Sequence, residues 1–343
     1  MTENTYSYIP GPAVYIQKKD AICEAGISVS FLGKKALVLC DSLIQKKYYE
    51  ALASALRDSC LKAESFTFSG ECTYEESGRV YAAVKGKNYD FLIGFGGGKV
   101  LDTAKLAGVQ LKLPWVLIAT SASTCAAWTA VAIVYNADGT FRDIVDTGKA
   151  PAVTLVDENS ILEAPAELLI AGIGDSFAKY HEAKHISSFK QVEKDELAKA
   201  ALFVSAQMYK VIRNSKASKQ EIINANIAMS GYVSTAGRDA ASALFAHAFA
   251  NSVLTFKGAK EKLHGYLAAL GVVFEYGMLK EKFPDALHYK RYGLPLTFEE
   301  LGLKPAKIEL VQMTELILKD DSVEYFYPKL KKEAVLSSLK EIL

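Results

Sequence analysis

A run of glycines between a buried strand and a helix is the feature that constrains this chain most. Residues 91–93 form a short apolar run that suits a parallel strand, and residues 100–107 return to helical spacing. Between them lie Gly94, Gly96, Gly97 and Gly98. Glycine lets the backbone approach a ligand closely, and the following helix would present free N–H groups at its N-terminus. The stretch predicts a phosphate-binding strand–turn–helix unit.

Two common phosphate-binding motifs do not match it. A GxGxxG motif that starts at Gly94 would require glycine at Lys99. A Walker A loop that ends at Lys99 would require glycine at Ile93 and Ser or Thr at Val100. A plain tight turn is the alternative, but it would not need so many adjacent glycines, because each costs backbone entropy. Phosphate binding is the better interpretation.

Composition narrows the class of partner. The 343 residues, 50% of them apolar, allow two domains with cores of their own. Lys and Arg (40) balance Asp and Glu (39), so no basic field favours nucleic acid or an anionic membrane. The N-terminus lacks a signal-peptide pattern, no apolar segment approaches the ~18 residues of a membrane span, and the five cysteines form no CxxC pair. We therefore expect a cytoplasmic protein that binds small molecules.

Strands alternate with helices in the first half of the chain. The expected strands are residues 13–16, 36–40, 65–68, 91–93, 115–119 and 153–156. Thr73 and Glu76 predict a capping box that opens a helix, and residues 136–139 predict the turn of a hairpin between strands 131–135 and 140–145. This order predicts a parallel sheet with helices on both faces and ligands at the carboxyl ends of its strands.

The pattern changes between Asp157 and Pro165, where strand-like runs stop. The expected helices beyond this point are residues 168–185, 194–212, 219–231, 240–256, 263–276, 306–319 and 328–342. We therefore expect an α/β domain over residues 1–160 and an all-α domain over residues 161–343.

Two of the five histidines suggest a metal site. His247 lies in a helix of small apolar residues, and His264 opens another helix. Core histidines with hydrogen-bond partners are the alternative. Asp175, which follows a Gly-Ile-Gly segment at the head of an apolar helix, is a plausible third ligand. One carboxylate and two imidazoles with an open position are typical of catalytic zinc or ferrous sites.

A rival metal motif is HExxH at residues 181–185, which would place two imidazoles on one helical face with a glutamate as base. However, Lys184 puts a cation between the proposed ligands, and no obvious third ligand follows at the spacing of the metzincin proteases. We interpret His181 and His185 as a polar helix face.

Taken together, these motifs make the sequence similar to the iron-containing (group III) alcohol dehydrogenases and, within them, to the glycerol dehydrogenase branch. The similarity covers nearly the whole chain. The shared motifs, in the same order, are GxGGGKxxDxAK at residues 94–105, TxxST at residues 120–124, the hairpin residue Tyr135, GIGD at residues 172–175, HAxxN at residues 247–251 and HG at residues 264–265. The resemblance implies a dinucleotide-binding α/β domain and a helical metal- and substrate-binding domain, the dehydroquinate synthase-like architecture, with the active site between them.

The resemblance also implies roles for residues. Asp175, His247 and His264 would hold a divalent metal and so form the catalytic centre. Asp41 would accept hydrogen bonds from a ribose and repel a 2′-phosphate, which favours NAD over NADP. The full set implied for the nucleotide is Asp41, Gly97, Gly98, Lys99, Asp102, Thr120, Ser123, Thr129, Val131 and Tyr135. A homo-oligomer is expected.

The chain departs from the family pattern in two places. Iron-preferring relatives have a fourth ligand, histidine, where this chain has Lys179, so three ligands favour zinc while iron, manganese and cobalt stay open. Glycerol dehydrogenases have a polyol-binding aspartate where this chain has Cys125, which resembles the hydroxycarboxylate dehydrogenase A branch. We expect a substrate pocket formed by Cys125, Trp128 and Lys179 that accepts a carboxylate. Lys179 and Arg238 are candidate anchors, with a surface salt bridge as the alternative for each.

The main hypothesis is NAD-dependent interconversion of 2-oxo acids and 2-hydroxy acids. A glycerol, diol or simple alcohol dehydrogenase on the same scaffold is the second. A lyase of the dehydroquinate synthase type would need Lys and Arg around the metal, and the helices that carry His247 and His264 have few. A non-catalytic nucleotide sensor would not need the metal triad.

Overall fold

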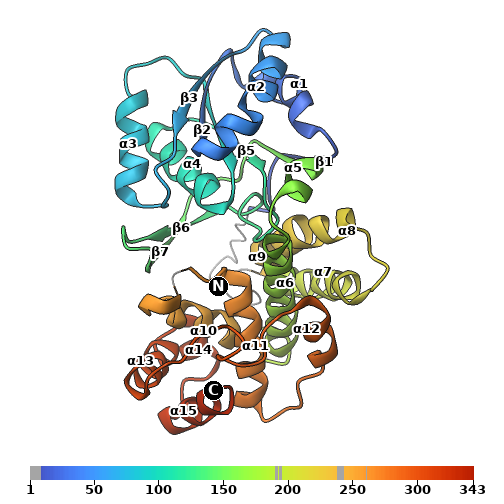
Figure 1. The fold of residues 1–343 in the computed structure, drawn as a ribbon, viewed down its shortest axis with the longest axis vertical. Coiled ribbons are helices and arrows are strands. Elements are labelled where there is room, and N and C mark those ends of the chain that lie inside the picture. The colour runs from blue at the N-terminus through green and yellow to red at the C-terminus, as the bar shows by residue number, and fades with distance from the viewer. Residues whose placement is uncertain (1–8, 190–191, 193–194, 238–242, 260) are drawn as a thin grey trace, which may run out of the picture.

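The computed structural model describes residues 9–189, 192, 195–237, 243–259 and 261–343. Figure 1 shows an elongated molecule with an α/β part at one end and a helical part at the other. Strands of the main sheet come from residues before 158, and helices account for the described regular structure that follows. This arrangement confirms the predicted fold class. The expected domain boundary at residues 160/161 falls inside helix α5 (Glu158–Glu163) and stays a prediction.

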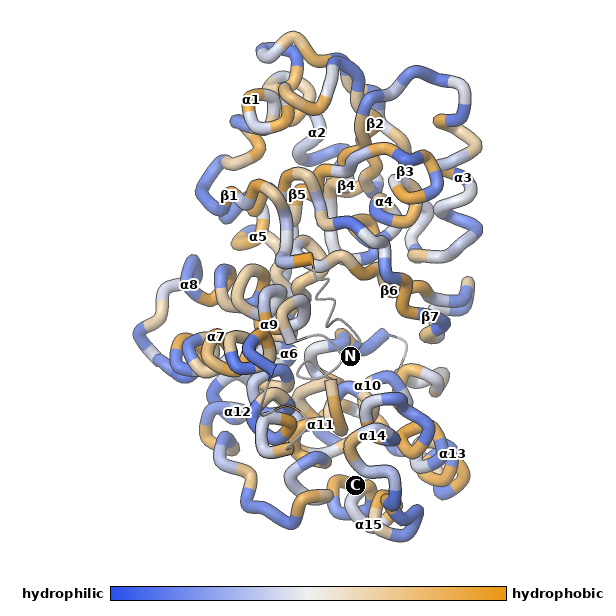
Figure 2. The backbone as a smooth tube through the Cα atoms, turned by 180° about the vertical axis from the view of Figure 1, so that it is seen from behind, coloured by the Kyte–Doolittle hydropathy of each residue, from blue (hydrophilic) through white to orange (hydrophobic). Residues whose placement is uncertain are grey.

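The sheet has six parallel strands in the order β1-β8-β5-β4-β2-β3. Their bounds are β1 Val14–Lys18, β2 Lys35–Cys40, β3 Lys62–Thr67, β4 Phe91–Gly96, β5 Trp115–Ala119 and β8 Val153–Asp157. Every residue of the central strands β4, β5 and β8 is buried, as apolar runs without alternation predict. In Figure 2 the hydrophobic colour follows these strands.

Helices cover both faces of the sheet, as expected. Val38 and Cys40 of β2 pack into one core with α1 (Ala25–Val29) and α2 (Ser42–Asp58). Leu37 and Leu39 pack into the other core, with α3 (Tyr74–Val84) and α4 (Gly98–Leu111). Side chains alternate between the two faces because the strand period is two.

The predicted capping box of α3 is only half formed. Thr73 accepts a hydrogen bond from the backbone N–H of Glu76 at 2.9 Å, as expected. The Glu76 carboxylate, however, binds Ser69 and Arg79. Arg79, one turn further along the helix, therefore binds the carboxylate that would otherwise accept a hydrogen bond from the backbone N–H of Thr73.

The predicted hairpin forms a separate antiparallel pair, β6 (Val131–Tyr135) and β7 (Phe141–Asp146), with an irregularity after Val134. The short helical elements of the α/β part are the 3-10 turns Ala21–Glu24 and Ser30–Leu32. Gly139 has a φ of 81° in the hairpin turn, a conformation that glycine adopts without strain.

The helical part is built around α6 (Ala166–Ile186), which packs on α7 and α11, and α11 in turn packs on α10. The other bounds are α7 Glu196–Arg213, α8 Lys219–Asn224, α9 Ser230–Gly237, α10 Phe245–Val253, the 3-10 turn Lys257–Ala259, α11 His264–Leu279, α12 Ala286–Tyr292, α13 Lys307–Leu318, α14 Asp321–Phe326 and α15 Lys332–Glu341. Among the described residues, no helix combines the length and apolar composition needed to cross a bilayer.

The predicted helices are present, with two differences. The expected helix over residues 219–231 is interrupted by a π-helical segment, Ala225–Met229, so α8 and α9 are separate. The short helices α5, α12 and α14, of six or seven residues each, were not predicted. The expected starts at residues 194 and 240 lie outside the described residues.

Candidate functional site

The glycine turn joins β4 to α4 at the carboxyl edge of the sheet. Gly97 is the N-cap of α4, and a Cβ added there would meet open space. A Cβ on Gly98 would only touch Thr124 and Ala126 at ordinary distances, so both glycines leave room for a ligand. Gly94 differs from the expectation. Its Cβ would lie 2.7 Å from the Cβ of Ala104, so Gly94 lets the strand and helix pack closely.

Lys99 stands in the first turn of α4 and is engaged by an acidic side chain. Its Nζ lies 2.6 Å from Glu71 Oε2 and 5.3 Å from the ring centroid of Tyr135. The hairpin and the loop that carries Glu71 therefore border the glycine turn. Lys99 is half exposed, which leaves it accessible to an anionic ligand.

Asp102 supports the hairpin from inside α4. One carboxylate oxygen pairs with Lys105 Nζ at 2.8 Å, and the other accepts a hydrogen bond from the backbone N–H of Ile133 at 3.1 Å. Lys105 is fully buried and donates to the carbonyl of Val131 at 2.7 Å. Burial raises the pKa of Asp102 although Lys105 opposes this. Lys105 ends the GxGGGKxxDxAK motif, but no role was predicted for it, and its place three residues after Asp102 was the available signal.

The remaining predicted nucleotide residues follow neighbouring strands. Asp41 comes directly after β2 and caps α2 by accepting from the N–H groups of Leu43 and Ile44 at 2.9 Å. Thr120 follows β5, and its N–H donates to the carbonyl of Gly96 at 3.1 Å. Ser123 lies in the same loop, bonded to Ser121, and Thr129 is buried near Lys105. Because β5, β4 and β2 are adjacent, these residues gather at one edge of the sheet.

The three predicted metal ligands lie together. Asp175 comes from α6, His247 from α10 and His264 from the first position of α11. One ligand atom from each lies within 4.8 Å of the others. Among the described residues, this is the one group of three such side chains that could hold a metal ion. Nε2 of His247 lies 3.3 Å and Nε2 of His264 lies 3.8 Å from Asp175 Oδ1. One carboxylate oxygen and two imidazole nitrogens fit a zinc or ferrous ion.

Glycines bring these helices into backbone contact. A Cβ on Gly265 would lie 1.7 Å from the carbonyl oxygen of Ala171, and a Cβ on Gly174 would lie 2.3 Å from that of Gly265. Helices α6 and α11 therefore cross with no side chain between them, which places Asp175 beside His264. Asp175 lies in the interior of α6, not at its head as expected.

Charges around the cluster are strongly coupled. Burial alone would raise the pKa of Asp175, but Lys179 and His247 hold it well below its usual range. Burial alone would lower the pKa of His247, but Glu182 and Asp175 raise it to about 10. Burial lowers the pKa of His264 to about 4, so this ring is neutral at neutral pH and its nitrogen can bind a metal.

Lys179 is buried one turn after Asp175 and is not a surface residue. Its Nζ lies 3.0 Å from Asp175 Oδ2 and 2.9 Å from both Cys125 Sγ and Ser230 Oγ. Burial lowers the pKa of Lys179, but Asp175 and Cys125 reverse this and raise it, so the side chain is an ammonium. The structure thus brings Lys179 and Cys125 together beside the metal ligands.

Trp128, the third residue of the predicted pocket, packs at the junction of the two halves. Its Nε1 donates to the carbonyl of Pro10 at 3.1 Å, and its ring lies against Tyr15 and over Gly231, where a Cβ would clash with it. The other candidate anchor, Arg238, lies outside the described residues.

The HExxH segment forms no metal site of its own in the described part of the chain. His181 lies between Asp285 and Tyr276, with 2.9 Å to each, and His185 pairs with Glu275. The expectation of a polar helix face is wrong in one respect, because both histidines are buried.

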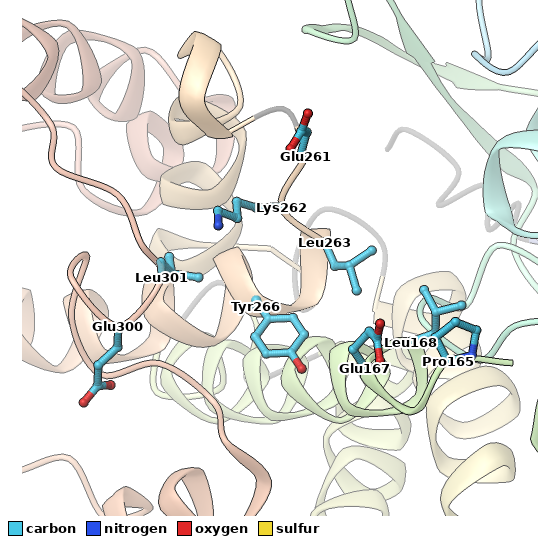
Figure 3. A pocket seen from close by; sticks show the side chains of 9 residues that line it. All are labelled: Pro165, Glu167, Leu168, Glu261, Lys262, Leu263, Tyr266, Glu300 and Leu301. Atoms are coloured by element: carbon cyan, nitrogen blue, oxygen red, sulfur yellow. The ribbon is translucent and has the colours of Figure 1, made fainter.

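A cavity of about 530 Å³ is lined in part by residues that precede and follow His264 in the sequence. Figure 3 shows Glu167 and Leu168 of α6 and Tyr266 of α11 around the same space. None of the predicted site residues is among those that line it. They are Pro165, Glu167, Leu168, Glu261, Lys262, Leu263, Tyr266, Glu300 and Leu301.

Comparisons with known proteins identify relatives of this chain. Residues 12–158 match the family model "Iron-containing alcohol dehydrogenase". The chain is 29% identical to a glycerol dehydrogenase of Citrobacter freundii over 315 residues, which cover 86% of this chain and 85% of that one. It is also 29% identical to hydroxycarboxylate dehydrogenase A of Escherichia coli over 300 residues, 82% of each chain.

A probable glycerol dehydrogenase of Sinorhizobium meliloti has the same fold, with a TM-score of 0.86 and 23% identity over 98% of this chain and 97% of that one. The sequence matches and the fold point to one family. The chain is therefore similar to the iron-containing alcohol dehydrogenases and is a dehydrogenase that acts on alcohol groups.

Proposed function

We propose that this protein interconverts 2-oxo acids and 2-hydroxy acids with NAD(H) and a divalent metal. The observation that carries the proposal is the buried ammonium of Lys179 beside the metal ligands. A positive charge at this point favours a substrate that carries a carboxylate next to the carbonyl. By the resemblance, glycerol dehydrogenases have an aspartate at the position of Cys125. That aspartate would repel a substrate that carries a carboxylate.

The contacts of Lys179 support this role. Asp175 Oδ1 faces the two histidines, and Asp175 Oδ2 faces Lys179. The Asp175 carboxylate therefore lies between the ammonium and the proposed metal position. Its three N–H donors contact Asp175, Cys125 and Ser230. Asp175 is the single carboxylate among these three partners, so a substrate carboxylate would be the second. We infer that a substrate carboxylate replaces one of these partners.

Asp175, His247 and His264 would hold the metal, and zinc is the ion that a three-ligand set favours. When bound, a divalent ion there would polarise the substrate oxygen and stabilise the alkoxide that develops during hydride transfer. The protein would contribute one imidazole nitrogen from each histidine, that of His247 after the metal displaces its proton, and the fixed orientation of their helices.

NAD would bind at the carboxyl edge of the sheet, with its pyrophosphate at the N-terminus of α4 beside Gly97, Gly98 and Lys99. Asp41, after the neighbouring strand β2, favours the ribose hydroxyls of NAD over the phosphate of NADP. The hairpin residues Val131 and Tyr135 and the loop residues Thr120, Ser123 and Thr129 would complete the site. A cytoplasmic location and a homo-oligomeric state stay predictions.

A second candidate is the oxidation of glycerol or another small alcohol. It is supported by the similarity to the Citrobacter freundii glycerol dehydrogenase, which is as high as that to hydroxycarboxylate dehydrogenase A. The two candidates share the cofactor, the metal and the fold, so the substrate separates them.

The test measures the rate of NADH oxidation with 2-oxobutanoate or 2-oxoglutarate and compares it with the rate with dihydroxyacetone. Each rate is measured before and after a chelator removes the metal. We expect chelator-sensitive turnover of the oxo acids, and Lys179→Met to lower their kcat/KM by about 10–100-fold, as loss of a charged hydrogen bond does. Lys184→Met, an exposed lysine of the same helix, is the matched control. Wild-type preference for dihydroxyacetone would favour the second candidate.

A further inference from the structure

The HExxH segment of α6 contains a glutamate that the proposed function leaves without a role. Glu182 is fully buried, and its side chain leaves α6 in a different direction from those of His181 and His185. The two histidines reach Asp285 and Glu275. Glu182 instead reaches α10 and makes three contacts there. Its position seven residues after Asp175 accounts for this, because two helical turns return a side chain to the same face.

The contacts of Glu182 converge on the metal ligand His247. Oε1 accepts hydrogen bonds from the backbone N–H of Leu244 at 2.7 Å and from that of His247 at 2.9 Å. Oε2 lies in hydrogen-bonding contact with Nδ1 of the His247 ring. One carboxylate thus holds both the backbone and the ring of the same histidine.

The ring contact decides which nitrogen of His247 can bind a metal. An ionised carboxylate only accepts hydrogen bonds, so Nδ1 must carry the hydrogen that Glu182 binds. Once a metal displaces the other ring proton, the lone pair is on Nε2, which is the atom that lies 3.3 Å from Asp175. Metal-binding histidines commonly have such a carboxylate behind them, which fixes the tautomer and the ring orientation.

The backbone contacts fix the helix that carries the ring. Leu244 is the N-cap of α10 and His247 is in its first turn, where N–H groups have no partner within the helix. Glu182 supplies acceptors for two of them, and a negative charge at this end is favourable to the helix dipole. The start of α10 is therefore held against α6 by the same residue that orients the ring.

We propose that Glu182 is a positioning residue for the divalent metal and that it acts through His247. The inference rests on the proposed metal site of Asp175, His247 and His264. It assigns to the glutamate of the HExxH segment a role in metal affinity, while the two histidines of that segment serve a separate buried network.

The matched control is Asp285, a fully buried carboxylate that holds a histidine of the same helix, His181, but contacts none of the metal ligands among the described residues. Asp285→Asn removes one buried charge beside a histidine of α6, as Glu182→Gln removes one beside His247, and it also affects the contacts of Asp285 with Tyr209, Arg213 and His288. A purely structural effect would therefore appear in both variants, and an effect on the metal only in Glu182→Gln.

The experiment measures the affinity of metal-free protein for Zn²⁺ by competition with a chelating dye, without nucleotide or substrate. We expect Glu182→Gln to raise the dissociation constant by about 10–100-fold, the usual effect of losing such a partner, and Asp285→Asn to leave it within twofold. The visible absorption of the Co²⁺-loaded protein, which reports ligand geometry, should change in Glu182→Gln and not in Asp285→Asn.

Circular dichroism and the melting temperature of the metal-free proteins show whether each variant is folded. Should Glu182→Gln fail to fold, Glu182→Asp keeps the charge and shortens the side chain, and we expect a smaller loss of affinity. A folded variant that binds Zn²⁺ as tightly as the wild type would overturn the proposal, as would equal losses in both variants. If the wild type itself binds neither ion, the proposed metal site is wrong as well.

Discussion

At the scale of single residues, Lys99 shows how an internal contact can tune cofactor binding. Its pair with Glu71 is partly exposed, and an incoming pyrophosphate must compete with this carboxylate. We expect Glu71→Gln to lower the dissociation constant for NADH by up to about fivefold, because exposed ion pairs contribute up to about 1 kcal/mol. Fluorescence titration with NADH measures this. Glu75→Gln is the control, since Glu75 lies on the adjacent helix but pairs with Arg142. An unchanged NADH affinity would show that Lys99 does not bind the pyrophosphate.

His181 predicts a pH dependence of stability. Burial lowers its pKa below the ordinary value of 6.5, although Asp285 opposes this. Below about pH 6.5 the unfolded chain therefore binds a proton that the folded protein does not, so the free energy of unfolding falls as the pH falls. We expect His181→Gln to be less stable than the wild type at pH 7.5 but to lose less stability between pH 7.5 and 5.5. Urea unfolding at both values checks this, and a steeper loss in the variant would contradict it.

Which residues were predictable depended on where their partners lie. Asp175, His247 and His264 stand in short motifs, so their grouping could be predicted from the sequence, and the structure brings them together. Glu182 also stands in a motif, but its partner His247 is 65 residues away, so the sequence associated it with its own neighbours. Lys105 likewise donates to the carbonyl of Val131, 26 residues away. The path of the chain between these two residues could not be predicted from the sequence.

At the scale of elements, the crossing of α6 and α11 sets the positions of the proposed metal ligands Asp175 and His264. Gly265 follows His264, and a Cβ there would collide with the backbone of α6. We expect Gly265→Ala to cost about 1–3 kcal/mol in the free energy of unfolding, as overpacking does, and to weaken Zn²⁺ binding by moving His264. Gly277→Ala, in the same helix but with only ordinary contacts, should be neutral or stabilising. Similar melting temperatures for both variants would show that the helices can separate freely.

Elements with strong periodicity were predicted well. The buried strands are apolar runs bounded by polar residues, and long helices such as α6 carry several turns of pattern. Helices α12 and α14 have too few residues for a period to stand out. The π-helical segment 225–229 was missed because its cause is tertiary. Asn226 and Ile227 within it are buried against other elements.

At the scale of the whole molecule, the predicted order of an α/β half and a helical half is correct, but the residue that joins them had no signal in the sequence. Asn226 is fully buried and donates to the carbonyl of Ala122, 104 residues away, at 3.1 Å and to that of Leu169 at 3.0 Å. It also accepts from Ser176 at 3.2 Å. The loop after β5, on the nucleotide side, is thereby tied to α6, on the metal side.

This junction predicts a coupled loss of stability and activity. Asn226→Leu has a similar size but leaves both carbonyls without their donor, which we expect to cost about 1–3 kcal/mol in the free energy of unfolding. Because the hydride must pass between groups held by the two halves, we also expect a lower kcat with little change in the dissociation constant for NADH. Thermal unfolding and steady-state kinetics test this, with Asn224→Leu as the control, which loses a 3.3 Å bond to Gln17 and a hydrogen bond with Tyr15 but no bond to either carbonyl. If Asn226→Leu is destabilised while its kcat stays at the wild-type value, Asn226 stabilises the fold without aligning the two halves.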